Sequence, residues 1–286
     1  MRPDRITQFG NSVVQHGPLN GRAYLMRLDP EDSPHIVSRL ERLAEDNGYT
    51  KIFAKVPEGA ANDFAEAGYR TEAVVPGFFN GEECGLFMGR YFAEWRRVPA
   101  NAGELRRVLR TARENVRPCA ENGLSRPEDR LPGGYRLRRL GPEHAEDMAA
   151  LYSEVFSSYP FPIHEPDYLR ETMADDVCYF AACCDGAPAA LCSAEVDRDA
   201  GVAEMTDFAT LPAHRGLGLA GHLLSRAERA MSALGLSTLY TIARAASYGM
   251  NITFARAGYD YSGILPNNTN ISGGLESMNV WHKSLD

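Results

Sequence analysis

Apolar and polar residues alternate along the second half of the chain in a pattern that predicts a regular succession of strands and helices. Residues 177–184 and 187–197 are apolar runs joined by Asp185-Gly186, a pair typical of a hairpin turn. Residues 142–157 and 219–234 carry apolar side chains at helical spacing. Strands alternating with helices indicate an α/β (α+β) fold. The other predicted elements are strands at 135–140, 204–211, 238–245, 259–265 and 276–283, helices at 166–174 and 248–257, and an Asn-rich loop at 266–274.

A glycine-rich loop, Arg215-Gly-Leu-Gly-Leu-Ala220, joins the predicted strand at 204–211 to the predicted helix at 219–234. Gly216 and Gly218 have no Cβ, so the backbone can turn tightly with its N–H groups pointing outward together. The helix adds its own unpaired N–H groups and the positive end of its dipole. The loop therefore predicts a site for an anion, and a pyrophosphate fits it best.

Two phosphate-binding interpretations compete for this loop. Its glycines fit the dinucleotide fingerprint G-x-G-x-x-G, but that motif needs a carboxylate at the end of the next strand. Here the next strand ends in Arg244. The other interpretation is the R/Q-x-x-G-x-G/A loop that holds the pyrophosphate of coenzyme A, and residues 215–220 fit its spacing.

A motif of the second half recurs in the first half. The segment Phe64-Ala-Glu-Ala-Gly-Tyr69 is repeated 190 residues later as Phe254-Ala-Arg-Ala-Gly-Tyr259. A register without gaps over roughly 40 residues indicates an internal duplication. The first copy has no glycine-rich loop, and its equivalent stretch at 25–33 is acidic, so we expect it to shape structure or substrate instead. The same offset aligns Ile52 with Ile242, Gly59 with Gly249, Pro76 with Pro266, Asn80 with Asn270 and Met88 with Met278.

The expected organisation is a first domain at 1–95, a helical linker at 96–132 and a catalytic domain at 133–286. The linker contains a basic stretch at 104–116 that predicts a solvated helix rather than an anion site. Its arginines are Arg106, Arg107, Arg110, Arg113 and Arg117.

The formal net charge of the 286-residue chain is −8, which gives no basic field for nucleic acid or an anionic membrane. An acidic protein suits a cationic small-molecule substrate. Six scattered cysteines show no zinc-ligand spacing, so we expect reduced thiols and no metal. We find no apolar run that could span a bilayer and no signal peptide, and we expect a cytoplasmic protein that is a monomer or a homodimer.

From 135 to 285, the order of elements, the Arg215-x-x-Gly218-x-Ala220 loop and the pair Gly258-Tyr259 resemble the GCN5-related N-acetyltransferases (GNAT). This resemblance implies a GNAT fold, in which helices flank a central mixed sheet, with a degenerate GNAT-like domain before it. It also implies acetyl-CoA as the co-substrate.

Nearly the whole chain more narrowly resembles the β-lysine N-acetyltransferases. This resemblance implies acetyl transfer to the terminal amine of β-lysine, which gives Nε-acetyl-β-lysine, a compatible solute used in osmoadaptation. The matching segments are 51–57, 76–78, 159–164, 204–212, 240–245, 249–251, 267–271 and 276–281.

Acetyl transfer needs a base, because an alkylammonium with a pKa near 10.4 keeps the nucleophilic amine disfavoured by roughly 4–5 kcal/mol at neutral pH. Glu204 lies eleven residues before Arg215, where some GNAT relatives carry a catalytic glutamate. Strand alternation predicts Asp207 on the opposite face. We expect Glu204 to be the base, with Asp207 or a solvent-fed base as alternatives.

Many GNAT relatives place a tyrosine four residues before the glycine of the Gly-aromatic pair, as the acid toward the leaving thiolate. That position is Phe254 here. Either Tyr240, Tyr248 or Tyr259 replaces it, or the thiolate leaves unprotonated, which a thiol pKa near 8.5 makes tolerable.

The resemblance also implies the cofactor and acceptor contacts. A strand that splays from its neighbour after Glu204 would free backbone groups for the pantetheine arm, and the loop N–H groups would hold the pyrophosphate. Rival functions are acetylation of a polyamine, diamine or amino acid, and a non-catalytic acyl-CoA sensor. The expected cofactor-binding residues are Phe208, Ala209, Thr210, Arg215, Gly216, Leu217, Gly218, Leu219, Ala220, Asn251 and Phe254, and the expected substrate contacts are Tyr159, Phe161, His164, Arg244, Asn267, Asn268 and Glu276.

Overall fold

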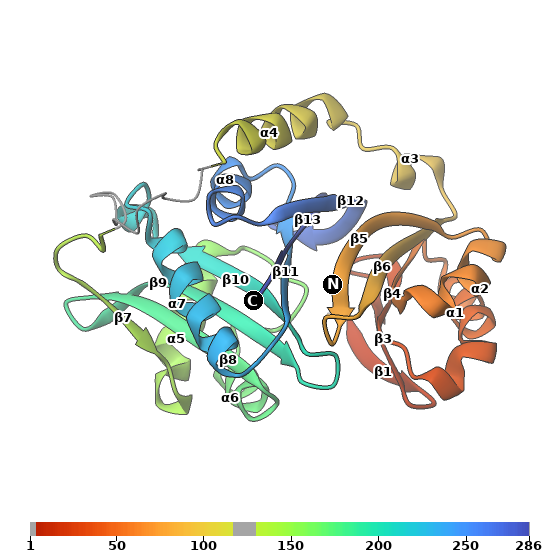
Figure 1. Cartoon of the computed structure of the whole chain (residues 1–286), viewed down its shortest axis with the longest axis horizontal. Coiled ribbons are helices and arrows are strands. Elements are labelled where there is room, and N and C mark those ends of the chain that lie inside the picture. The colour runs from red at the N-terminus through yellow and green to blue at the C-terminus, as the bar shows by residue number, and fades with distance from the viewer. Residues whose placement is uncertain (1–3, 117–129, 286) are drawn as a thin grey trace.

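The described strands form one 13-stranded mixed sheet that runs through both halves of the chain (Figure 1). The computed structural model describes residues 4–116 and 130–285. Helices cover both faces of the sheet in the second half, which confirms the predicted α/β class. The strand order is β1-β2-β3-β4-β6-β5-β12-β13-β11-β10-β9-β8-β7.

The first half places its helices on one face of its strands, where α1 and α2 close a core around Ile36, Leu40 and Phe64. The opposite face joins the largest core of the molecule, which the second half shares. The elements are β1 (Arg5–Phe9), β2 (Ser12–Gly17), β3 (Arg22–Arg27), α1 (Ser33–Asn47), β4 (Lys51–Pro57), α2 (Ala61–Glu66), β5 (Arg70–Phe79) and β6 (Glu83–Tyr91).

The second half contains each helix and strand that the hydrophobic pattern predicts, with small shifts at the ends, except that the strand predicted at 259–265 continues to Ile271. Its helices α5 and α7 lie on opposite faces of the sheet. The elements are β7 (Tyr135–Arg139), α5 (Ala145–Val155), α6 (Pro166–Ala174), β8 (Val177–Cys184), β9 (Ala187–Asp197), β10 (Val202–Thr210), α7 (Leu219–Ala233), β11 (Thr238–Arg244), α8 (Tyr248–Arg256), β12 (Asp260–Ile271) and β13 (Gly274–Ser284).

Both halves use the same strand pairings, as a duplication requires. In the first half β3 runs parallel to β4, and β4 and β5 both pair with β6 in antiparallel fashion. In the second half β10 runs parallel to β11, and β11 and β12 both pair with β13 in the same way. The halves meet where Gly263 of β12 pairs with Ala73 of β5. A Cβ at Gly263 would lie 2.0 Å from the carbonyl oxygen of Glu72, so only glycine permits this approach.

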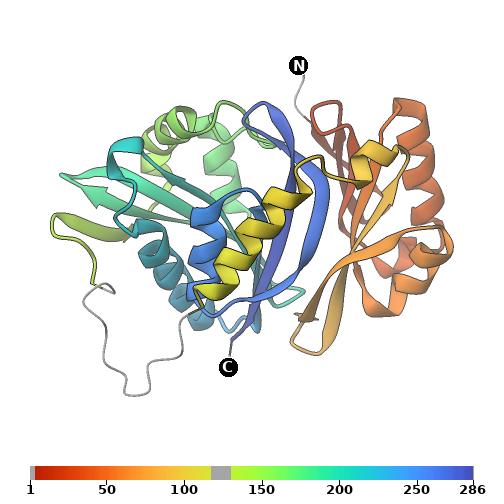
Figure 2. The ribbon, with the colours of Figure 1, turned by 90° about the horizontal axis from the view of Figure 1, so that it is seen from above.

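The predicted linker helix is only half solvated. Two helices connect the halves, α3 (Glu94–Arg97) and α4 (Ala102–Glu114), and α4 lies along α8 (Figure 2). Leu105, Val108 and Ala112 of α4 are buried, and Ala112 belongs to the core of the second half, so α4 packs on that half. The arginines of α4 are exposed, as predicted, and the guanidinium of Arg113 also lies over the ring of Tyr261. Arg117 lies outside the described residues.

The Asn-rich segment is not the separate loop that the sequence predicts. Residues up to Ile271 continue β12, and Thr269 pairs with Glu276 of β13. The pairing is interrupted between Leu265 and Thr269, where Asn267 has a φ of 41°. Asparagine tolerates this left-handed backbone, so the segment forms a bulge inside a long strand.

Candidate active site

The glycine-rich loop has the conformation that an anion site needs. Gly216 and Gly218 have φ values of 79° and 73°, a region that favours glycine. Helix α7 begins directly afterwards at Leu219, so the first N–H groups of the helix have no intrahelical acceptor. The guanidinium of Arg215 is exposed and donates its Nε–H to the carbonyl of Thr210 at 3.2 Å. The loop therefore presents a row of main-chain donors beside a cation.

These donors line a groove, here called the outer groove, with a volume of about 450 Å³. Its walls come from the loop, from the end of β10 and from the start of α8. A groove of this kind fits a nucleotide and its diphosphate. The lining residues include Phe208, Thr210, His214, Arg215, Gly216, Leu217, Gly218, Leu219, Ala220, Ser247, Gly249, Met250 and Thr253.

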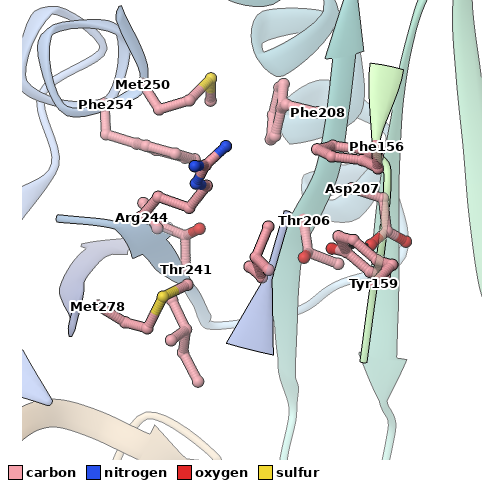
Figure 3. Close-up of a pocket in the computed structure, with 13 residues that line it drawn as sticks. Phe156, Tyr159, Thr206, Asp207, Phe208, Thr241, Arg244, Met250, Phe254 and Met278 are labelled. Atoms are coloured by element: carbon pink, nitrogen blue, oxygen red, sulfur yellow. Dashed lines mark hydrogen bonds between the residues drawn. The ribbon is translucent and has the colours of Figure 1, made fainter. Parts of the chain in front are cut away.

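Strands β10 and β11 part beside this groove. Their parallel pairing covers only Val202 to Glu204 on β10. Beyond Glu204 the two strands enclose a middle cavity of about 70 Å³ (Figure 3). Thr206, Asp207 and Phe208 line it from β10, and Thr241 and Arg244 line it from β11. The splay expected after Glu204 is therefore present.

The middle cavity leads to an inner cavity of about 80 Å³ between the two halves of the molecule. Tyr159, Thr206 and Asp207 line both cavities. The first half contributes side chains from β3 and β4, and the second half contributes carboxylates from β9 and β10. The principal residues are Arg22, Tyr24, Met26, Phe53 and Lys55 on one side, and Glu195, Glu204 and Asp207 on the other.

A β-bulge brings Asp207 to the same side of the sheet as Glu204. The pairing of β10 with β9 shifts between Thr206 and Ala209, and Asp207 has a φ of 52°. The prediction that Asp207 lies on the opposite face is wrong, because the bulge breaks the alternation of side chains. Glu195 lies directly opposite Glu204 in the antiparallel pair. Three carboxylates therefore share one buried space.

Burial raises the pKa of each of these carboxyl groups. For Glu195 the neighbouring Glu204 and Asp207 raise the pKa further, well above its usual range. For Glu204, Lys55 and the Tyr240 hydroxyl oppose the rise. A carboxylate with a raised pKa is a better proton acceptor near neutral pH than an ordinary surface carboxylate.

Asp207 is held by two hydroxyl groups. Tyr159 donates to its Oδ1 at 2.6 Å, and Ser193 donates to its Oδ2 at 2.6 Å. Burial raises its pKa, and these hydrogen bonds oppose the rise. Both oxygens already accept strong hydrogen bonds, so the arrangement fixes the wall between the middle and inner cavities.

Lys55 supplies a half-buried cation from the first half. Its Nζ donates to the Tyr240 hydroxyl at 3.0 Å. Burial alone would lower the pKa of Lys55, but Tyr24 and Glu204 raise it above its usual value. Tyr240 packs between Phe78 and Phe87 and does not line the three cavities, so its hydroxyl meets Lys55 and Glu204 rather than a bound thiol.

Three predicted cofactor contacts lie away from the outer groove. Ala209 is buried in the core. Asn251 is a structural residue: its Nδ2 donates to the carbonyls of Arg244 and Ser247, and its Oδ1 accepts from Asn279 and Trp281. Phe254 lines the middle cavity and packs its ring edge against Phe208.

The predicted substrate contacts separate into two groups. Tyr159, Phe161 and Asn268 line the inner cavity.

The other predicted contacts have structural partners. His164 shares a hydrogen bond with the carbonyl of Phe156. Asn267 donates to the carbonyls of Trp95 and Arg96 and ties α3 to β12. Glu276 forms a two-bonded ion pair with Arg244 and holds that side chain at the edge of the middle cavity.

Sequence reasoning missed the contribution of the first half. Arg22, Tyr24 and Lys55 belong to a copy without a glycine-rich loop, and no local motif marks them. Glu195 is a polar residue near the end of an apolar hairpin strand, and nothing in its local sequence marks it. The one available signal was the matching segment at 51–57, which contains Lys55.

The open row of N–H donors, the slot between the parted strands and the carboxylate-lined cavity lie next to one another. Residues 145–259 match the model of the Acetyltransferase (GNAT) family. No helix among the described residues is long and apolar enough to cross a membrane.

Three curated proteins are similar over most of this chain. It is 35% identical to the Beta-lysine N(6)-acetyltransferase of Methanococcus maripaludis, with 98% of each chain covered. It is 32% identical to the protein of the same name from Methanosarcina mazei, over 87% of this chain and 97% of that one. It is 29% identical to N-acetyltransferase YodP of Bacillus subtilis, with 96% of each covered. The chain belongs to the GNAT family and is an acetyl-CoA-dependent N-acetyltransferase.

Proposed function

We propose that the enzyme transfers the acetyl group of acetyl-CoA to the terminal amine of β-lysine. The observation that carries this proposal is the inner cavity, where the buried Asp207 and the half-buried Glu195 and Glu204 face two cations, Arg22 and Lys55, at the end of the splay. β-Lysine has two ammonium groups and one carboxylate, so it needs partners of both signs. The curated relatives named for this reaction support the choice.

In this proposal the outer groove holds the nucleotide end of acetyl-CoA. The N–H groups of residues 216–220 would bind the pyrophosphate at the start of α7. The pantetheine arm would follow the splay beside Phe208 and Thr210, where β11 no longer pairs with β10. The thioester would then reach the middle cavity, next to the acceptor.

Glu204 is the proposed base. The terminal ammonium of the acceptor gives its proton to the carboxylate, and the free amine nitrogen attacks the thioester carbonyl carbon. The carbon–sulfur bond breaks, and the electron pair leaves on the CoA thiolate. The nitrogen then releases its second proton to solvent, which gives the neutral amide. Tyr159 is the tyrosine that lines the middle cavity, and its hydroxyl is bonded to Asp207. We therefore favour departure of the unprotonated thiolate over protonation by Tyr240, Tyr248 or Tyr259.

The domain assignment also remains our proposal. We assign 133–286 to catalysis, 96–132 to a helical linker and 1–95 to a degenerate GNAT-like copy that shapes the acceptor cavity. The product would carry one ammonium and one carboxylate and no net charge, which suits a compatible solute. Dependence on acetyl-CoA is the reason for the proposed cytoplasmic location.

A panel of amines tests the proposal. We expect kcat/KM for β-lysine to exceed that for lysine, spermidine and 1,5-diaminopentane by at least about tenfold, since each analogue leaves buried polar groups unpaired. CoA thiol release gives the rate, and NMR of the product locates the acetyl group. Faster turnover of lysine or spermidine would contradict the assignment, and tight acetyl-CoA binding without amine-dependent thiol release would favour the sensor.

The Glu204→Gln variant is the companion test of the base. We expect slow turnover at pH 7 and partial recovery above pH 9, because more of the amine is then deprotonated in solution. A variant with the wild-type pH profile would move the role to Asp207 or solvent.

A further inference from the structure

Arg22 is a buried cation in the inner cavity whose hydrogen bonds all run to neutral oxygens. Its Nη1 donates to the carbonyl of Asn268 at 2.7 Å and to the hydroxyl of Thr269 at 3.3 Å, and its Nη2 donates to Gln15 at 3.4 Å. Its Nε–H has no partner among the described residues. Burial lowers its pKa to about 10, so the guanidinium stays charged at neutral pH.

Asn268 lines the same cavity and, among the described residues, has an unpaired hydrogen-bond acceptor, whereas Arg22 has an unpaired donor. Its side chain is buried, and its Nδ2 donates to Thr269 at 3.3 Å. Its Oδ1 accepts no hydrogen bond from the described residues. Buried polar groups are normally hydrogen-bonded, so a buried polar atom without a partner in the protein is open to a bound molecule that supplies one. Since Arg22 bonds the main chain of Asn268, an unused donor and an unused acceptor lie at the same end of the cavity.

A carboxylate satisfies a guanidinium, and an ammonium satisfies an amide oxygen. An amino-acid head group carries both within a few bonds. We propose that Arg22 and Asn268 hold the carboxylate and the neighbouring ammonium of the acceptor, so that the first half selects amino acids over plain amines. This proposal rests on the proposed function, because it orients β-lysine in that site.

The rest of the inner cavity fits this orientation. Tyr24, Met26 and Phe53 offer apolar surface to the methylene chain. The far amine would then lie near Glu204, the proposed base, at the end of the inner cavity where Thr206 and Asp207 also line the middle cavity.

The chemistry of Arg22 supports the same class of acceptor. Spermidine has no carboxylate, so it would leave Arg22 facing a cation or an empty space.

The experiment uses acceptors that each lack one group of β-lysine. Pentane-1,4-diamine lacks the carboxylate, and 6-aminohexanoate lacks the neighbouring amine. In Arg22→Gln we expect kcat/KM to fall roughly 100-fold for β-lysine and for 6-aminohexanoate, mainly through KM. The rate with pentane-1,4-diamine should stay within about threefold of the wild type, and Arg22→Lys should recover part of the loss.

A second variant tests the acceptor atom. Asn268→Ala should weaken the use of β-lysine by about tenfold and leave 6-aminohexanoate nearly unchanged, because that analogue has no ammonium at this position.

The chain offers a matched control. Arg96 is also a buried arginine with an unpartnered Nε, but it does not line the three cavities. Arg96→Gln should lower the melting temperature without changing the ratio of rates between the acceptors. The head-group assignment is wrong if Arg22→Gln lowers kcat/KM equally for β-lysine, 6-aminohexanoate and pentane-1,4-diamine. It is also wrong if Arg22→Gln leaves the KM for β-lysine unchanged. Wild-type preference for lysine or spermidine would instead contradict the proposed function.

Discussion

The two halves of the molecule share one topology, but only the second is open. In the first half, β3 pairs with β4 from Arg22–Lys51 to Leu25–Ala54. The repeat offset of 190 places residues 51–54 of β4 on residues 241–244 of β11, where β11 has already parted from β10. Residues 51–54 of β4 therefore pair with β3 and close the sheet in the first copy. The equivalent residues 241–244 of β11 do not pair with β10, and this leaves a slot in the second copy.

The helix starts differ in the same sense. Helix α7 begins after Gly218, whereas α1 begins after Asp32. The Asp32 carboxylate accepts hydrogen bonds from the N–H groups of Asn11 and Ser12 at 2.8 Å each. The first copy thus carries a carboxylate at the start of α1, where the second copy has glycine, and this carboxylate is bonded to the turn between β1 and β2 rather than to the helix. We infer that duplication let one copy keep cofactor binding while the other lent Arg22 and Lys55 to the acceptor cavity.

The largest expected effect comes from placing a carboxylate in the glycine-rich loop of the second copy. Gly218→Asp places a carboxylate next to the proposed pyrophosphate and a Cβ on a left-handed backbone, so acetyl-CoA binding should weaken on the order of 100-fold. Titration calorimetry gives the dissociation constant. The matched change in the first copy is Asp32→Gly, which should leave acetyl-CoA affinity and a stoichiometry of one per chain unchanged. If the acetyl-CoA dissociation constant of Gly218→Asp equals that of the wild type, the loop does not bind the pyrophosphate.

A smaller effect concerns the cluster of carboxylates. The folded-state pKa of Glu195 lies above its unfolded value, so the folded protein binds more protons and loses stability as pH rises from the unfolded pKa through the folded one. The Glu195→Gln variant should therefore have a free energy of unfolding about 1–2 kcal/mol higher than that of the wild type at pH 8. At pH 4 the two free energies should differ little. Urea denaturation at both pH values measures this, and a variant destabilised at pH 8 would show that the charge is fully compensated.

The sequence predicted the elements of the second half well, because each has a clear period and clear ends. The hairpin around Asp185-Gly186 and the helix after Gly218 follow from local chemistry alone. The repeat predicted the first half by analogy. The prediction of a loop in the Asn-rich segment was wrong, because asparagine favours a left-handed backbone conformation both in loops and in bulges.

The site was harder to predict than the fold. The bulge at Asp207 depends on how β10 fits against β9, and strand alternation cannot foresee such a shift. Arg22 and Lys55 are brought to the cavity by the packing of one copy against the other, and no spacing along the chain reports that contact. The glycine-rich loop was found because all its groups are consecutive in the sequence.

The central claim is that the second half binds acetyl-CoA and the first half helps to bind the acceptor. A crystal structure with CoA and β-lysine tests it most directly. We predict diphosphate oxygens within hydrogen-bond distance of the N–H groups of residues 216–220, and the β-lysine carboxylate on Arg22. A nucleotide at the start of α1, or a β-lysine molecule that contacts the second half alone, would contradict the account.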